Sequence, residues 1–354
     1  MISINKVTSI SLLLVIIVVS LIFLKSILVP LILATIFWLI VVEVRTLIGN
    51  LLGSDKNKIP VWIQNILATL TIFAIFFVAI KMLSISIQNL TESLSHYDGN
   101  LVLIEDKVNN LFDIDITTSL NKMIGDYNFT SLLKNILTSV TGLFGNTFTI
   151  ILYVVFLLLE ESVFGDKLVK IYPDAKEYQA VVKMIAKIGN SVSSYLTLKS
   201  FVSLLTGVLS YMVLKLMGID APFFWALLIF ALNYIPTIGS LIATLFPAFF
   251  TVIQFADLSS GLIVLLSVGV IQVIIGNLVE PKVMGNSLNI SGLVVLIALA
   301  FWGALWGVVG MILSVPITVM MIIIFGEFES TRPIAIILSE NGNIGTTIRE
   351  SEKE

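Results

Sequence analysis

The sequence predicts an all-α protein that crosses a membrane several times, and two observations carry this prediction. Of the 354 residues, 57% are hydrophobic and only 12% are charged, and the mean hydropathy is +1.05. A soluble domain carries about 25% charged residues, so this chain has too little polar surface to cover a globule in water. The apolar residues also gather in runs of about 20 or more, the length that a helix needs to cross a bilayer.

The first apolar runs, 7–24 and 27–44, are separated by Lys25 and Pro30 and form either two spans or a tight hairpin. A third run begins at Pro60, since proline is well suited to the first turn of a helix. Together with the polar stretches, the runs divide the chain into six segments. These are N-terminal transmembrane helices at 1–82, an extracytoplasmic polar helical region at 83–142, a transmembrane helix at 143–160, a cytoplasmic amphipathic segment at 161–195, a C-terminal transmembrane transport core at 196–326, and a cytoplasmic tail at 327–354, solvated and partly disordered.

Charge sets the expected orientation. The segment 160–199 is rich in lysine, whereas 84–140 is acidic. Because lysine and arginine favour cytoplasmic loops, both termini are predicted in the cytoplasm and 84–140 outside. Within 175–196, apolar side chains share one helical face and lysines the other. This helix either packs on the bundle with its lysines in water or lies on the membrane surface, and both alternatives stay open.

Two apolar runs of the C-terminal half, 221–255 and 291–325, are too long for one straight span. A single helix of this length would reach about 52 Å, whereas the hydrocarbon core is about 30 Å thick. Each run is therefore predicted to be a broken helix pair, which either crosses the membrane or re-enters it. The residues that favour a break, or gating there, are Pro236, Gly239, Pro247, Gly303, Gly307, Gly310 and Pro316. Close helix packing is the plainer explanation of the glycines at 303, 307 and 310.

The last 160 residues also carry a possible internal repeat. An apolar helix, a Met-Gly pair, a short polar link and a broken run occur in that order, first at 196–255 and again at 261–325. Transporters are often built from such repeats, with the substrate site at the helix breaks. The identity between the two copies is low, and chance similarity remains the alternative.

Three short motifs resemble those of one known family. They are the segment from Asn233 to Gly239, the segment from Asn277 to Gly285, and the glycine pattern from Gly303 to Gly310 followed by Pro316. In this order they resemble the autoinducer-2 exporter (AI-2E) family, also called PerM-like permeases. The resemblance implies a multi-pass inner-membrane protein of about eight spans that forms homo-oligomers such as pentamers. A count of eight needs each long run to be one crossing, so it favours broken crossings over re-entrant hairpins.

Four polar residues within the apolar core are candidates for lining a substrate path. Glu280 follows an uncharged span, and acids buried in a membrane are costly and usually functional. The alternative places Glu280 at the interface, paired with Lys282. Asn233 lies beside a predicted break, where it either binds a ligand or caps a helix. Gln272 and Asn277 precede Glu280 on the same span.

These features favour a secondary carrier or facilitator that exports a small polar solute, and the resemblance adds autoinducer-2 as the solute and quorum sensing as the process. A sodium/proton antiporter and a membrane scaffold are the alternatives. No enzyme, cofactor, metal site or nucleic-acid partner is expected. Cysteine is absent, no P-loop occurs, and the one histidine, His96, falls in the polar region, where a surface position without function is expected. The expected partners are the solute, the bilayer and further copies of the chain.

Overall fold

The computed structural model describes residues 4–52, 60–112, 147–284 and 289–344. Every regular element in these ranges is helical, which confirms the predicted all-α class. By length and composition, seven of the described helices could cross a membrane. The predicted polar region 83–142 is described only as far as Phe112, and the side chain of His96 lies outside the described part. The chain divides into two compact units, and each is described by itself.

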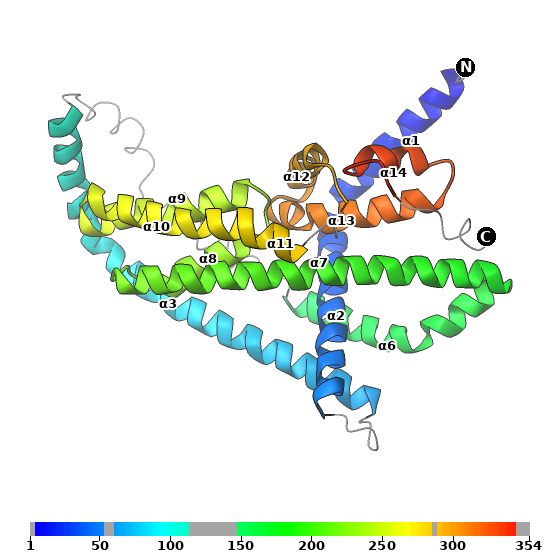
Figure 1. Cartoon of the computed structure of the whole chain (residues 1–354). Helices are drawn as coiled ribbons and strands as arrows, with labels where there is room; N and C mark the ends of the chain where they lie inside the picture. Colours follow the sequence, from blue (N-terminus) through cyan, green and yellow to red (C-terminus); the bar gives the residue numbers. More distant parts are fainter. Residues whose placement is uncertain (1–3, 53–59, 113–146, 285–288, 345–354) are drawn as a thin grey trace. The chain divides into compact units, whose positions relative to one another are not determined.

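Unit 1 comprises residues 1–69, 146–197 and 286–354 (Figure 1). Its helices are α1 (Ile4–Phe23), α2 (Lys25–Leu52), the first turns of α3 (Val61–Phe112), α6 (Thr147–Ile171), the first part of α7 (Ala175–Leu216), α12 (Gly292–Trp306), α13 (Val308–Glu327) and α14 (Arg332–Leu338). Helix α2 packs on α6, and α13 packs on both α12 and α14. A cluster of buried apolar side chains, with Trp302, Trp306 and Leu313 at its centre, joins α12 and α13 to α1 and α2.

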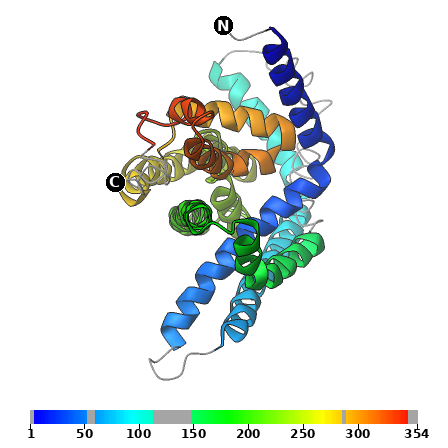
Figure 2. The ribbon, with the colours of Figure 1, turned by 90° about the vertical axis from the view of Figure 1, so that its right-hand side faces the viewer.

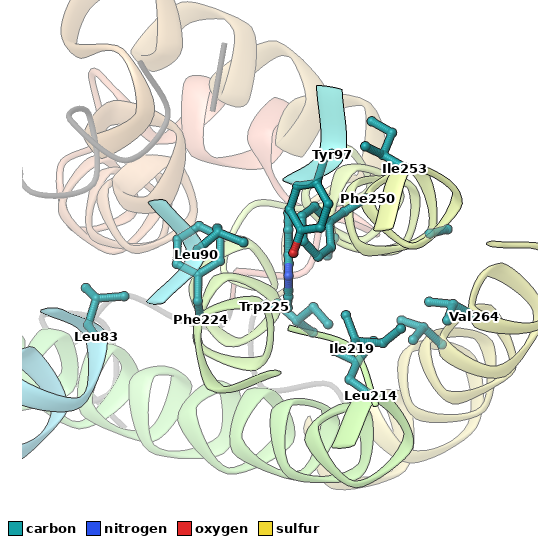
Figure 3. Close-up of a cluster of buried hydrophobic side chains, with 14 residues drawn as sticks. Leu83, Leu90, Tyr97, Leu214, Ile219, Phe224, Trp225, Phe250, Ile253 and Val264 are labelled. Carbon is teal, nitrogen blue, oxygen red and sulfur yellow. The ribbon is translucent and has the colours of Figure 1, made fainter. Parts of the chain in front are cut away.

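Unit 2 comprises residues 70–145 and 198–285. Its helices are the rest of α3 and of α7, followed by α8 (Pro222–Leu232), α9 (Ile238–Phe255), α10 (Leu258–Ile274), the π-helix η1 (Ile275–Val279) and α11 (Glu280–Met284). Buried side chains from α3, α7, α8, α9 and α10 form one core (Figure 3). At its centre the ring of Trp225 lies 4.9 Å from that of Phe250, and Tyr97 meets Phe250 edge-on.

The two long apolar runs are broken, as predicted. In the first, α8 ends at Leu232 and α9 begins at Ile238, with Thr237 at φ 58° in the turn between them. In the second, Gly307 alone joins α12 to α13, at φ 67° and ψ −143°. Glycine adopts a positive φ without steric cost, so Gly307 suits this sharp turn. The length argument and the glycine and proline pattern therefore located both breaks correctly.

In both apolar runs, the last residues lie close to the first ones. Across the ends of the first run, the side-chain amide of Gln254 donates to the Gly218 carbonyl and accepts from the Asp220 backbone N–H, both at 2.9 Å. At the base of the second run, the Ser291 N–H donates to the Leu338 carbonyl, and α14 folds back along α13. A crossing would separate the ends of a run by about 30 Å. The expectation of broken crossings is therefore wrong, because both runs form hairpins.

Two helices run past segment boundaries that the sequence predicted. Helix α6 continues past Glu161 to Ile171. The amphipathic segment and the following span are one helix, α7, which is 42 residues long; Figure 1 shows it straight, and Figure 2 shows it end-on. For residues 175–196, packing on the bundle and lying on the membrane surface both stay predictions. Beyond Gly326, the tail forms α14 and stays ordered to Ile344, with Ala335 fully buried. Sequence hydropathy marks where a helix leaves an apolar environment, but not where the helix ends.

Candidate functional site

A row of polar side chains runs along the buried face of α7 in unit 2. Lys199, Ser203, Thr206 and Ser210 follow one another at intervals of three or four residues, which places them on one helical face. Lys199 is 6% exposed, and the other three are completely buried. Burying polar groups costs free energy unless they find hydrogen-bond partners. The Ser210 hydroxyl has no hydrogen-bond partner among the described residues, whereas Lys199, Ser203 and Thr206 all make side-chain contacts.

The turn of the first hairpin meets this row. Asn233 follows the last residue of α8, is 8% exposed, and its side-chain amide donates to Ser203 at 3.3 Å and to Thr206 at 3.5 Å. The neighbouring Tyr234 hydroxyl is hydrogen bonded to the Ser200 hydroxyl at 2.6 Å. The hairpin tip is thus held on α7 by side-chain hydrogen bonds, and the two bonds of Asn233 are long.

Tight backbone packing holds the turn in place. Gly239 opens α9 directly against the end of α8, and a Cβ added there would lie 1.8 Å from the Leu232 carbonyl oxygen. Only a residue without a side chain fits at this point. Pro236 lies inside the turn, where its fixed φ and missing N–H suit a helix break. Helix α7 also approaches α8 closely at Gly207, where an added Cβ would lie 3.2 Å from the Ala226 carbonyl oxygen.

A charge pair extends the polar row at its N-terminal end. The Lys199 ammonium donates to the Glu280 carboxylate at 2.5 Å, and the two side chains are 7% and 24% exposed. Glu280 is the first residue of α11 and directly follows η1. The hypothesis that Glu280 pairs with Lys282 is therefore wrong. π-Helical turns are rare and often mark functional sites.

The other two candidates on this segment lie differently. Gln272, near the end of α10, has a buried side-chain nitrogen for which the described part of the chain provides no hydrogen-bond partner. Asn277 lies within η1 and is exposed. Of the four path candidates, the structure brings Asn233 and Glu280 to the α7 row, and it places Asn277 on an outer face.

The remaining break candidates fall into two groups. Gly310 resembles Gly239, because an added Cβ would lie 1.9 Å from the Trp302 carbonyl oxygen. Gly303 packs against the Met311 side chain. The other two, Pro247 and Pro316, lie inside α9 and α13, and neither proline ends its helix.

Sequence reasoning missed the α7 row itself. Lys199 was counted only as one of the lysines of a cytoplasmic segment, and the serines and Thr206 were absorbed into an apolar span. The signal was present, since four polar residues in an apolar helix share one face. The sequence could not show that Asn233 and Glu280 contact this row, because α7, the hairpin turn and α11 are far apart along the chain.

Two further polar groups lie outside this row, one in each unit. In unit 2, the hydroxyl of Tyr97 donates to Asp220, while Asn100 donates to the carbonyls of Ile253 and Gln254. These bonds fasten α3 to both ends of the first hairpin. Burial, and then the hydrogen bond to Asp220, raise the pKa of Tyr97.

In unit 1, an ion pair involves Glu161, an acid near the middle of α6. The guanidinium of Arg45 on α2 donates to both carboxylate oxygens of Glu161, at 2.9 and 3.3 Å. The indole N–H of Trp38 donates to the same carboxylate at 3.1 Å, and Asn65 accepts from Arg45 at 3.0 Å. The acid therefore fixes α2 against α6.

Comparison with known proteins agrees with this architecture. The family model described as "AI-2E family transporter" matches residues 11–330, nearly the whole chain. The chain belongs to the AI-2E transporter family. It is therefore a multi-pass membrane protein of a transporter family, which confirms the resemblance carried by the three motifs.

Individual AI-2E relatives show how far the similarity extends. The chain is 37% identical over 210 residues to the AI-2 transport protein TqsA of Escherichia coli, a match that covers 59% of this chain and 60% of TqsA, under two thirds of its length. It is 30% identical over 299 residues to a Haemophilus influenzae protein named as a candidate transport protein, covering 80% of this chain and 84% of that one. A similarly named protein of Borreliella burgdorferi is 33% identical over 276 residues, 76% of this chain and 74% of its own.

Proposed function

We propose that this AI-2E protein is a secondary carrier or facilitator that exports a small polar solute from the cell, and that the solute passes between the α7 row and the tip of the first hairpin. The observation that carries the proposal is the buried contact of Asn233 with Ser203 and Thr206. Sites for small molecules hold a few placed polar groups in largely apolar surroundings. The contact has this character.

The length of these hydrogen bonds supports a transient role. At 3.3 and 3.5 Å they are longer than the usual 2.9–3.0 Å of an N–H···O bond. A solute hydroxyl or carbonyl could replace them at little cost, because each polar group would exchange one partner for another. A hairpin tip that is held by weak polar bonds can separate from α7 more easily than one that is held by close apolar packing.

The solute class follows from the groups that are present. The hydroxyl groups and the side-chain amide at this contact can each donate and accept hydrogen bonds. Such groups suit a compact solute with several oxygen atoms. TqsA is named as an AI-2 transport protein, and AI-2 is the solute that we propose to test first. The proposed setting is the inner membrane, with both termini in the cytoplasm and the chain assembled as a homo-oligomer.

Transport by purified protein in proteoliposomes tests the proposal. Thr206→Val should reduce uptake of labelled AI-2, because it removes a hydroxyl that faces Asn233. Thr251→Val is the matched control: Thr251 is fully buried in the same unit and, like Thr206, donates to the carbonyl four residues before it. Equal loss of flux in the two variants, or unchanged flux in Thr206→Val, would remove this contact from the transport path.

The same vesicles separate the two alternative functions. A sodium gradient that drives proton movement without any solute flux would establish the antiporter instead. The pairing of Glu280 with Lys199 argues against that role, since the negative charge of the carboxylate is already balanced by the Lys199 ammonium. Absence of every flux from vesicles that contain the folded protein would favour a scaffold.

A further inference from the structure

The charge pair beside the α7 row has a consequence for the solutes that the path accepts. Residues 198–284 contain six charged side chains, and Lys199 and Glu280 are the two that adjoin the hairpin contact. The other four lie at the ends of helices. They are Lys215, Asp220, Asp257 and Lys282. No charged residue occurs in 221–256 or in 258–279, which form the hairpin and the helix that follows it.

We propose, resting on the proposed transport path, that Lys199 and Glu280 together form a charge filter: the pair keeps the site at zero net charge and so selects solutes that carry no net charge. Lys199 is followed on the next turn of α7 by Ser203, which contacts the hairpin tip. A solute bound between α7 and the tip therefore lies within one or two helical turns of the pair, whose lysine is almost completely buried.

The physical reason is the cost of an unbalanced charge in a membrane interior. A charge that lacks a partner there is expensive, and paired charges cancel most of that cost. A neutral solute exchanges hydrogen bonds with the row and leaves the pair balanced. An anion or a cation adds one charge to a site whose own charges are already matched, and Lys282, two residues after Glu280, is exposed.

Removing Lys199 and removing Glu280 should then have opposite effects on the preference for anions and cations. Glu280→Gln leaves the Lys199 ammonium without its counter-charge, so the site becomes positive and should accept anions. Lys199→Gln leaves the carboxylate, so the site should accept cations. Replacing both with glutamine restores zero net charge and should abolish both acquired preferences. A pair that merely held two helices together would predict equal losses for all solutes in both single variants.

Three labelled hexose derivatives of similar size serve as probes in proteoliposomes: glucose, which is neutral, glucuronate, an anion, and glucosamine, a cation at pH 7. The wild-type protein should carry glucose at least about tenfold faster than either charged sugar, which corresponds to about 1.4 kcal/mol of discrimination. Glucuronate flux should rise in Glu280→Gln, and glucosamine flux should rise in Lys199→Gln. The double variant controls for loss of the pair without a change in net charge.

Failure of the filter and failure of the transport proposal give different results. Wild-type protein that carries all three sugars equally well overturns the filter and leaves transport standing, and this holds even where a single variant does not fold. Single variants that keep the wild-type order of the three sugars overturn it as well. Folded wild-type protein that moves none of the three and no labelled AI-2 overturns the proposed path, and the filter with it.

Discussion

Replacement of Gly239 by alanine tests whether the first hairpin depends on close contact between its two arms. The added Cβ would lie 1.8 Å from the Leu232 carbonyl oxygen and 2.8 Å from its carbon, whereas real Cβ atoms essentially never come within 3.0 Å of another heavy atom. The turn must therefore open by more than 1 Å. Because the obstacle is backbone, no side-chain rotation can relieve it.

The expected cost lies at the upper end of the range for overpacking, about 3 kcal/mol. It corresponds to a change of about a hundredfold in the balance between the closed and the opened turn. The Asn233 contact with α7 should weaken with it, so both thermal stability in detergent and solute flux should fall. Gly310→Ala should have a similar effect on stability, since its Cβ would lie 1.9 Å from the Trp302 carbonyl oxygen.

Gly269→Ala provides the matched control. This glycine lies inside α10 in the same unit, and an added Cβ would make only an ordinary contact, 3.7 Å from the Thr244 side chain. Alanine is favoured over glycine within a helix by roughly 0.5–1 kcal/mol, so this variant should be as stable as the wild type or slightly more so. If Gly239→Ala unfolds at the same temperature as Gly269→Ala, the tight turn inferred here is refuted.

Three further predictions concern other parts of the chain. Arg45→Lys should lower the thermal unfolding temperature by an amount equivalent to about 1 kcal/mol, because lysine cannot donate to both carboxylate oxygens at once; an unchanged temperature would show that the pair contributes nothing. Tyr97 should remain protonated in folded protein at pH values where free tyrosine ionises, about pH 10. Tyr97→Phe should therefore remove one late step from the ultraviolet titration of the tyrosines. Ionisation of Tyr97 at the normal pH in the wild-type protein would contradict the buried bond to Asp220. In this cysteine-free chain, Ser259→Cys should react with an impermeant thiol reagent from outside and Asn286→Cys only from the cytoplasm, as two re-entrant hairpins require; the reverse pattern would restore the crossings.

The positions of the helix breaks could be predicted from the sequence, but the path of the chain after each break could not. A straight helix of 35 apolar residues is longer than the hydrocarbon core is thick, so each run must bend. Pro236 and Gly307 indicated where a bend costs little free energy. Whether the second arm continues across or turns back depends on hydrogen bonds such as those from Gln254 to Gly218 and Asp220. Those bonds join the two ends of the run, and they produce no periodic pattern in the sequence.

The candidate site was half predictable for a similar reason. Asn233 and Glu280 stand out because each interrupts apolar sequence, and both lie in the observed contact. Lys199 escaped notice because it follows a stretch that already contains several lysines, so its charge looked like part of a solvated segment. Only the continuity of α7 shows that it belongs to the buried row.

The π-helix η1 makes the number of residues before Glu280 matter as much as their identity. The π turn already holds one residue more than an α-helical turn, so one further residue inserted into 275–279 would rotate every later side chain by about 100° around the helix axis. Glu280 would then point away from Lys199 although both residues were still present. An insertion in this short segment is therefore expected to disable the pair more completely than most substitutions within it.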